Sequence, residues 1–265
     1  MQYEGVLNKM QTEINNPIEY YLIFKDNFIN LNQILDRTIK IDFIGYECLN
    51  CGQPKKIFRQ GFCYECFNSS ANAGDWIMRP ELSKAHLGIE DRDLAYETQV
   101  QLQPHIVYLA AASDVKVGVT RKTQVPTRWI DQGASRAVEI VEVPNRYLAG
   151  ITEVALKDKF TDKTNWRKML QNEITDANIQ EIRAELKALL PQEVQPYFDT
   201  TNHTTYELEY PVLSFPEKIK SLNLDKTPFY EGRLKGVKGQ YLLFEDGTVF
   251  NIRTYEGYVV RLNID

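Results

Sequence analysis

The sequence lacks any run of the roughly 18 apolar residues that a membrane-spanning helix needs. Its first residues, Met1 to Gly5, lack the basic and apolar regions of a secretory signal peptide. It contains neither a G-x-x-x-x-G-K-[ST] phosphate loop nor a G-x-S-x-G nucleophile turn. We therefore expect no membrane partner, no phosphate-loop nucleotide hydrolysis and no serine-hydrolase chemistry.

Histidine and cysteine are also scarce, with three histidines and four cysteines among 265 residues. The histidines, His86, His105 and His203, are scattered, and none has a second ligand at metal-binding spacing. All four cysteines lie in one short segment. A chain whose few cysteines are of metal-binding type fits a reducing compartment, so we expect a cytoplasmic protein.

The cysteines form two C-x-x-C pairs, which are Cys48 with Cys51 and Cys63 with Cys66. Two such pairs point four thiolates at one ion, and this donor set suits tetrahedral zinc. Gly52 and Gly61 supply the backbone freedom that tight turns beside the pairs require. Two disulfides or a redox pair are the competing interpretations. Four protein ligands leave no open position, so the predicted zinc is structural.

The loop between the pairs is basic, since it carries Lys55, Lys56 and Arg59. Zn²⁺ held by four thiolates is a dianion, so these cations either balance that charge or contact phosphate groups. Both interpretations stay open.

Charge is distributed unevenly along the chain. The net charge of −5 argues against a globally basic nucleic-acid binder. Residues 101–170 nevertheless contain eleven Lys/Arg against seven Asp/Glu, whereas residues 171–227 contain five against ten. A basic middle is compatible with a local phosphate-binding face, and equally with an ordinary solvated surface.

Apolar patterns and turn residues predict a mixed α+β protein of several parts. These are a β-rich N-terminal module (1–45), a four-cysteine zinc module and linker (46–74), an irregular connecting segment (75–104), a core (105–170), a helix and connector (171–227) and a C-terminal β-meander (228–265).

Within the core the order of predicted elements is ββαβα. Strands at 106–111 and 115–120 flank a Ser113-Asp114 turn, and a short helix from Thr127 ends at Gly133. A third strand covers 137–143, and Asn145 caps a helix running to about Lys159. A further amphipathic helix is predicted over 173–190, ended by Pro191.

The two ends of the chain carry similar β patterns. Tyr3 to Leu7 resembles Tyr230 to Leu234, which suggests that the ends pack near each other. Glycines at 239, 247 and 257 mark three turns between four C-terminal strands.

The core carries a family resemblance. Val107-Tyr108-Leu109, Lys116-Val117-Gly118-Val119-Thr120, Arg128 and Glu153 together resemble the GIY-YIG nuclease superfamily, nearest to a phage-type branch whose second motif reads Lys-Ile-Gly. The resemblance covers about a quarter of the chain and implies a small three-stranded ββαβα core. The whole arrangement is similar to a bacterial family of unknown function that joins a four-cysteine module to such a core.

The resemblance implies catalytic roles for four residues. Tyr108 would position or deprotonate the attacking water, Arg128 would hold the scissile phosphate, and Glu153 would bind one Mg²⁺ or Mn²⁺ ion. Lys116 would be an accessory to them. The matching substrate-binding positions are Gly118, Thr120, Arg121, Trp129, Gln132 and Asn165.

Three positions depart from the superfamily pattern. Lys116 replaces the tyrosine of the second motif, and Gln132 stands where a histidine is usual. Asn165 matches a late asparagine only with loose spacing. Trp129 either stacks a base or fills the core.

The expected function is therefore metal-dependent hydrolysis of phosphodiester bonds in DNA or RNA, with a structural Zn²⁺ and a catalytic Mg²⁺ or Mn²⁺. One alternative is a catalytically degenerate protein that binds nucleic acid without cutting it. The other is a zinc-stabilised scaffold for protein interactions.

Overall fold

The computed structural model describes residues 1–160 and 165–265, so residues 161–164 of the predicted core lie outside the described residues. The chain forms two compact units. Unit 1 comprises Met1–Asn68, Ile130–Gly133 and Leu208–Asp265, and unit 2 comprises Ser69–Trp129 and Ala134–Glu207. Sheets and helices occur together, which confirms the mixed α+β class. No helix in the described ranges is long and apolar enough to cross a membrane.

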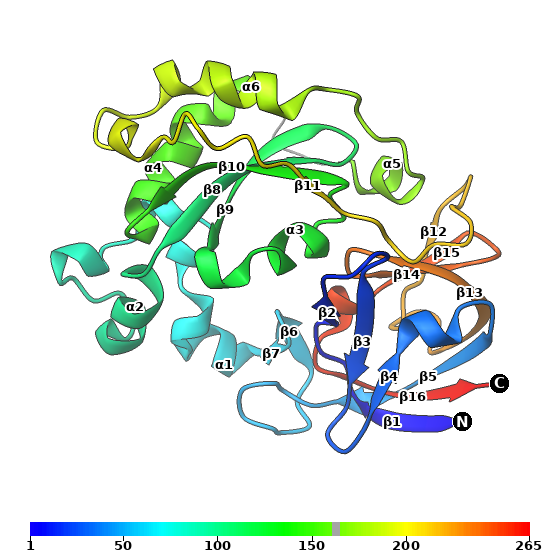
Figure 1. Ribbon diagram of the computed structural model, residues 1–265. Helices are drawn as coiled ribbons and strands as arrows, with labels where there is room; N and C mark the ends of the chain where they lie inside the picture. Colours follow the sequence, from blue (N-terminus) through cyan, green and yellow to red (C-terminus); the bar gives the residue numbers. More distant parts are fainter. Residues whose placement is uncertain (161–164) are drawn as a thin grey trace. The chain divides into compact units, whose positions relative to one another are not determined.

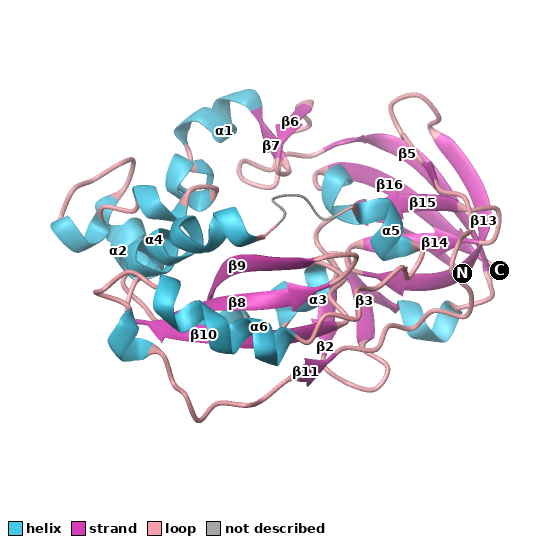
Figure 2. Cartoon of the chain, turned by 90° about the horizontal axis from the view of Figure 1, so that it is seen from above, coloured by secondary structure: helices cyan, strands magenta, loops and turns pink. Residues whose placement is uncertain are grey.

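A seven-stranded sheet, visible in Figure 2, dominates unit 1. Its strand order is β1-β16-β5-β13-β14-β15-β12, with β12 parallel to β15 and the other pairs antiparallel. The strands are β1 Gln2–Val6, β5 Thr38–Tyr46, β12 Lys220–Ser221, β13 Phe229–Lys238, β14 Tyr241–Phe244, β15 Thr248–Asn251 and β16 Tyr258–Ile264. Because β1 pairs with β16, the two ends are neighbours, as the sequence suggested.

Two of the three predicted C-terminal turns close hairpins. Gly239 and Gly247 both have positive φ, and they connect β13 to β14 and β14 to β15. The third turn, at Gly257, follows the 3₁₀ helix Ile252–Tyr255, whose first turn is capped by Asn251. That turn directs β16 to β5 and β1, so the predicted four-strand meander is wrong in its last strand.

Two smaller sheets complete unit 1. A three-stranded sheet consists of β2 Gln11–Glu13, β3 Glu19–Ile23 and β4 Phe28–Asn30, followed by the 3₁₀ helix Leu31–Ile34. The four-cysteine segment contains the hairpin of β6 Ile57–Arg59 and β7 Phe62–Cys63 and the start of helix α1 Tyr64–Ser69.

Unit 2 is built on a four-stranded antiparallel sheet of order β11-β10-β8-β9. Its strands are β8 His105–Ala111, β9 Val115–Arg121, β10 Arg136–Val143 and β11 Tyr206–Glu207. Along the chain, α3 Thr127–Asp131 precedes β10, and α4 Arg146–Leu156 follows it. The predicted ββαβα order is therefore present, but β11 from the connector adds a fourth strand.

The two faces of this sheet differ in chemistry because side chains alternate along each strand. One face bears the aliphatic side chains of Val107, Leu109 and Val138, which pack with Ala149 and Leu156 of α4 and with α6 (Figure 1). On the other face Tyr108 lies opposite Gly118, and Ala110 lies opposite Lys116.

Asparagine caps set the helix boundaries of unit 2. The Asn145 side chain accepts a 2.9 Å hydrogen bond from the Leu148 N–H, as predicted, and α4 continues into a 3₁₀ turn at Lys157–Lys159. The helix predicted from residue 173 begins later, because Asn178 caps α6 Ile179–Glu185, which continues as a 3₁₀ helix over Leu186–Leu189. Further helical elements of unit 2 among the described residues after β10 are α5 Trp166–Leu170 and the 3₁₀ turn Gln195–Tyr197.

The segment predicted to be irregular, 75–104, is largely helical. It contains 3₁₀ turns η3 Asp75–Ile77, η4 Pro80–Leu82 and η5 Ala85–Leu87 and helix α2 Leu94–Gln101, with further 3₁₀ turns nearby at Ala71–Ala73 and Lys122–Gln124. Helix α2 lacks an apolar stripe, since its buried residues are Glu97 and Gln101. Glu97 accepts hydrogen bonds from three preceding backbone N–H groups. A hydrophobic pattern cannot predict this role.

A glycine lets this segment approach α4 closely. A Cβ atom at Gly150 would lie 2.2 Å from the Glu81 nitrogen and 2.3 Å from the Pro80 carbonyl carbon. Both are backbone atoms, so neither can rotate away. Only a residue without a side chain permits η4 to rest on α4.

Replacing Gly150 by alanine should therefore destabilise unit 2, by about 1–3 kcal/mol in the free energy of unfolding, because the methyl group overpacks a backbone contact. Denaturant unfolding measures the change. Gly45→Ala is the matched control, since nothing lies within 4 Å of a Cβ at that position. Equal stability of the two variants would contradict the described packing.

Candidate functional site

The structure gathers the four cysteines into one cluster. Their sulfur atoms all lie within 4.8 Å of one another, and Cys48, Cys63 and Cys66 are buried. Zn–S bonds of about 2.3 Å would place four tetrahedral sulfurs about 3.8 Å apart, so the cluster is of the right size. Among the described residues all four are free cysteines, which argues against the disulfide interpretation.

Local hydrogen bonds prepare the cluster for a cation. Burial opposes ionisation of Cys48, but N–H groups of Cys51 and Cys63 lower the pKa of its thiol to about 6. The Asn50 side chain favours ionisation of Cys66, whereas hydrogen bonding with the Cys63 thiol and burial raise the Cys66 pKa to about 12. One thiolate forms readily while a neighbouring thiol keeps its proton, as expected where like charges crowd together without a cation.

The cluster is also the core of its own small module. Among the described residues, Ile57 and Phe62 are the apolar side chains that pack against the cysteines. So small a core cannot stabilise a fold alone, and metal binding then supplies folding energy. The donor set therefore fits a structural zinc ion, with no open position for a substrate.

A second group of chemically active side chains lies in unit 2, along one stripe of α4. Arg146, Gly150 and Glu153 are spaced four and three residues apart, so they share a helix face, and Lys157 continues the stripe. The Arg146 guanidinium donates to the carbonyl oxygens of Trp76 at 3.0 Å and of Ile77 at 2.8 Å. These two hydrogen bonds connect α4 to η3, the 3₁₀ turn that precedes Glu81 in the chain.

Strand β9 and helix α3 contribute further cations to the same charge cluster. Burial, followed by repulsion from Arg128, lowers the pKa of Lys116 to about 8, while Glu153 acts in the opposite direction. Burial likewise lowers the pKa of Arg146 to about 10, and Arg121 and Arg128 add repulsion.

Glu153 is half-buried among these cations. Burial raises the pKa of its carboxyl group, and neighbouring Glu81 adds to the increase. Lys157, Arg146 and Arg128 act in the opposite direction and favour the carboxylate. A desolvated carboxylate thus lies among cations that attract negative charge.

The cations of this cluster outnumber the groups that could neutralise them. In the part of the chain that the structure describes, neither Lys116 nor Arg128 makes a hydrogen bond or ion pair, although both are half-buried. Burying cations without acceptors is costly. The arrangement is therefore suited to bind an anion that accepts several hydrogen bonds.

Tyr108 and Gly118 lie together next to this cluster on the strands. Tyr108 is fully buried, and a Cβ at Gly118 would lie 2.6 Å from its hydroxyl oxygen. The missing side chain at Gly118 lets the phenol ring lie across β9. Trp129 contacts the same ring edge-on, with centroids 5.9 Å apart.

The other predicted substrate-binding residues have local structural roles or lie elsewhere. Trp129 is fully buried and packs against Tyr206, so its faces are covered by protein. The buried Thr120 hydroxyl lies 3.4 Å from the Gln124 side-chain oxygen. The Asn165 oxygen accepts from the N–H groups of Arg167 and Lys168 as the cap of α5. Gln132 belongs to unit 1.

Sequence reasoning missed Arg146, Glu81 and Lys157. A signal for Arg146 existed, because Asn145 marks the helix start and the spacing of Arg146 and Glu153 then places both on one face. Glu81 had no such signal, since its position depends on the contact of η4 with Gly150.

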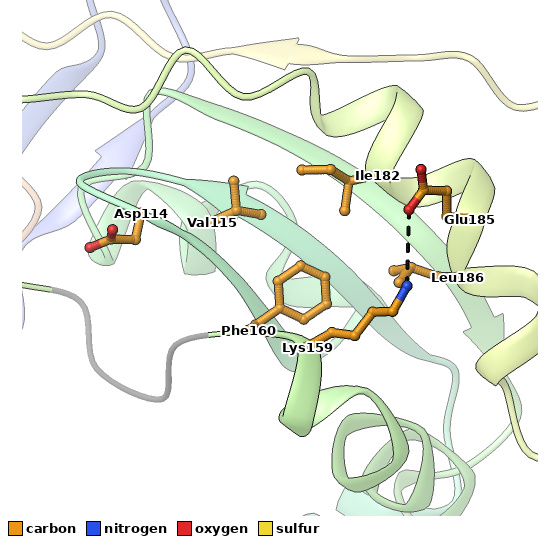
Figure 3. Close-up of a pocket in the computed structure, with 7 residues that line it drawn as sticks. All are labelled: Asp114, Val115, Lys159, Phe160, Ile182, Glu185 and Leu186. Atoms are coloured by element: carbon orange, nitrogen blue, oxygen red, sulfur yellow. Dashed lines mark ion pairs between the residues drawn. The ribbon is translucent and has the colours of Figure 1, made fainter.

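The cavity drawn in Figure 3 is not lined by residues of the charge cluster. It has a volume of about 360 Å³ and is lined by Asp114, Val115, Lys159, Phe160, Ile182, Glu185 and Leu186. None of the predicted site residues is among them. An ion pair of Lys159 with Glu185 crosses its rim at 3.9 Å.

Comparison with known proteins gives one match. A family model described as "Protein of unknown function (DUF2797)" matches residues 36–260, a range that includes the cysteine cluster and the charge cluster. No curated protein and no solved structure gives a significant match.

The cysteine geometry predicts about one zinc ion per chain. Replacing Cys63 by serine removes one of four thiolates, so metal content after dialysis against a chelator should fall well below half an equivalent. Elemental analysis of the purified chain measures this. Tyr64→Ala, at the exposed neighbouring position, is the control and should keep its zinc. Full retention of zinc by Cys63→Ser would contradict the predicted coordination.

The lowered pKa of Lys116 predicts a pH-dependent stability. The pKa of Lys116 is about 8 in the folded chain and 10.5 in the unfolded chain, so between these pH values the unfolded chain holds a proton that the folded chain has released. The free-energy penalty for burying the charged ammonium group is therefore fully present below pH 8 and disappears towards pH 10.5. Lys116→Met should raise the free energy of unfolding at pH 7 by about 1–3 kcal/mol.

That gain should shrink as the pH rises from 8 to 10.5, as measured by denaturant unfolding at several pH values. The exposed Lys187→Met variant provides the comparison and should show no such trend. A gain for Lys116→Met that stays constant over this pH range would argue against a buried, destabilised ammonium group.

Proposed function

We propose that this chain, which belongs to the DUF2797 family, uses unit 2 to bind a phosphodiester group of DNA or RNA and to hydrolyse it with the help of a divalent cation. The observation that carries the proposal is the pair of half-buried cations, Lys116 and Arg128, beside the half-buried carboxylate of Glu153. Cations suit the substrate's charge, and the carboxylate suits a metal ion.

Arg128 and Lys116 take the phosphate-binding role in this proposal. The guanidinium has five N–H donors in a planar fork that matches two phosphate oxygens, and the ammonium adds a point charge. A bound phosphate would supply the acceptors that these side chains lack among the described residues. It would also raise the pKa of Lys116 by stabilising its protonated form.

Glu153 takes the metal-binding role. Mg²⁺ and Mn²⁺ are usually held by one or two carboxylates plus water and substrate phosphate, and Glu81 lies close enough to Glu153 to influence its pKa. When bound, such an ion would stabilise negative charge on the reacting phosphate. The cation would also lower the raised pKa of Glu153, so the donor set fits it.

The resemblance of the core to GIY-YIG nucleases supports the same roles for Arg128 and Glu153. Elements β8, β9, α3, β10 and α4 follow each other in the ββαβα order that this superfamily uses. Tyr108 is fully buried behind Gly118, so in this proposal it positions β9 and Lys116 and does not contact water. Arg146 positions Glu81 through its two backbone hydrogen bonds.

The proposed reaction is hydrolysis. A water oxygen attacks phosphorus, the bond from phosphorus to the leaving oxygen breaks, and the proton lost by the water is balanced by one gained by the leaving group. Arg128 and Lys116 hold the non-bridging oxygens, which carry more negative charge in the transition state than in the substrate. The free thiols of the zinc module suit a reducing cytoplasm as the place of this activity.

Binding without cleavage is the second candidate. It is favoured by the burial of Tyr108 and by the presence of Lys116 and Gln132 where the superfamily uses tyrosine and histidine. The cluster would then hold nucleic acid through its cations, and its affinity would fall steeply with salt concentration.

A cleavage and binding assay separates the two candidates. The substrates are single- and double-stranded DNA and RNA, with Mg²⁺ or Mn²⁺. Glu153→Gln should slow cleavage by about 10²-fold or more while binding stays within about threefold, because the lost group acts on the metal ion. Arg128→Ala should weaken both.

Glu185→Gln serves as the control, because this exposed glutamate on α6 lies outside the cluster. Cleavage by wild type that Glu153→Gln leaves unchanged would refute the assigned metal site. Binding that depends on Arg128, with no cleavage of any substrate, would establish the second candidate. Neither binding nor cleavage would refute both.

A further inference from the structure

The zinc module carries three aromatic rings that its core does not use. Phe58 of β6 and Tyr64 and Phe67 of α1 lie outside the set that packs on the cysteines, and we call these three the aromatic patch. Ile57 packs against the cysteines, whereas Phe58, which follows it, lies at an irregularity in the β6–β7 pairing and is exposed. Tyr64 and Phe67 are three residues apart and so share one face of α1.

Two of the three rings of the patch are exposed. Phe58 is 46% exposed and Tyr64 is 64% exposed, large fractions for aromatic side chains. The Phe58 ring meets Tyr64 at 5.2 Å and 81° and meets Phe67 at 5.3 Å and 69°, both edge-to-face arrangements. Such pairs favour fixed ring orientations, and Tyr64 leaves most of its surface accessible to a flat partner.

Cations border the patch. The Arg59 guanidinium carbon lies 5.4 Å from the centre of the Phe58 ring, and Lys56, directly before β6, is exposed. Lys55 forms an ion pair with Glu65, and this pair neutralises the carboxylate that lies next to Tyr64 in the sequence. A surface that combines ring faces with arginine and lysine is complementary to a ligand with flat bases and a phosphate backbone.

We propose that the aromatic patch is a binding surface for a short single-stranded segment of nucleic acid, with a base stacked on Tyr64 and phosphates near Arg59 and Lys56. A duplex keeps its base faces covered by neighbouring bases, so it cannot stack on the patch. The proposal extends the proposed function of unit 2 and takes from it the choice of nucleic acid as ligand. It concerns binding by unit 1 and needs no cleavage.

A binding assay with full-length, zinc-loaded protein tests the proposal. The probe is a fluorescent twelve-nucleotide oligo-dT, with a mixed-sequence duplex of equal length for comparison, and the readout is anisotropy. Tyr64→Ala should weaken oligo-dT binding by about fivefold or more, and Phe58→Ala should weaken it further, because each removes an aromatic surface. The duplex should bind equally to all variants.

Matched substitutions separate stacking from simple apolar contact. Tyr64→Phe keeps the ring and should bind oligo-dT like wild type, whereas Tyr64→Leu keeps apolar bulk without a ring and should bind like Tyr64→Ala. Phe229→Ala removes another exposed ring of unit 1, on β13, and should have no effect. Elemental analysis should show unchanged zinc in every variant, so that a folded module is compared throughout.

The outcomes distinguish this inference from the proposed function. Unchanged oligo-dT affinity in Tyr64→Ala, or full affinity in Tyr64→Leu, would overturn the stacking surface even if Glu153-dependent cleavage were found. Binding that requires the Tyr64 ring in a protein that cuts no substrate would uphold the surface and refute the nuclease. If the wild-type protein did not bind oligo-dT, the inference would be overturned, and a protein would be the remaining candidate partner of the patch.

Discussion

The candidate site of unit 2 depends on a backbone contact that a single missing methyl group permits. Because Gly150 has no Cβ, the 3₁₀ turn at Pro80–Leu82 rests directly on α4. Arg146, one turn earlier on the same helix face, can then bind two carbonyl groups of the preceding turn. Glu81 comes to lie near Glu153 as a result. Close packing and the electrostatics of the site therefore have one origin.

Desolvation is the main influence on the charged groups of that site. It lowers the pKa of Lys116 and Arg146 and raises that of Glu153, so burial disfavours the charged form of all three. Mutual attraction between Glu153 and its cationic neighbours offsets part of this cost. A group that binds between them and brings negative charge would relieve more of it, and such unfavourably buried groups are typical of binding sites.

Features encoded by neighbouring residues were predictable from the sequence. Asn145 and Gly133 mark helix boundaries through their own backbone and side-chain chemistry, and the cysteine spacing alone predicted the cluster that the structure forms. Features that depend on distant segments were not predictable. The pairing of β16 with β5, the addition of β11 to the second sheet and the position of Glu81 all depend on such contacts. Helix α2 escaped prediction because polar side chains fill its buried positions.

The seven-stranded sheet of unit 1 cannot be completed until the end of the described chain has been synthesised. Strands β1 and β5 are made first, yet their partner β16 spans Tyr258–Ile264, and the Met1 amino group donates to the Ile264 carbonyl at 2.6 Å. Strands β8, β9 and β10, by contrast, lie within 40 residues of sequence, so their loops close at a small entropic cost. On the ribosome, unit 2 can pair its central strands while the first strands of unit 1 still wait for the residues that complete their sheet.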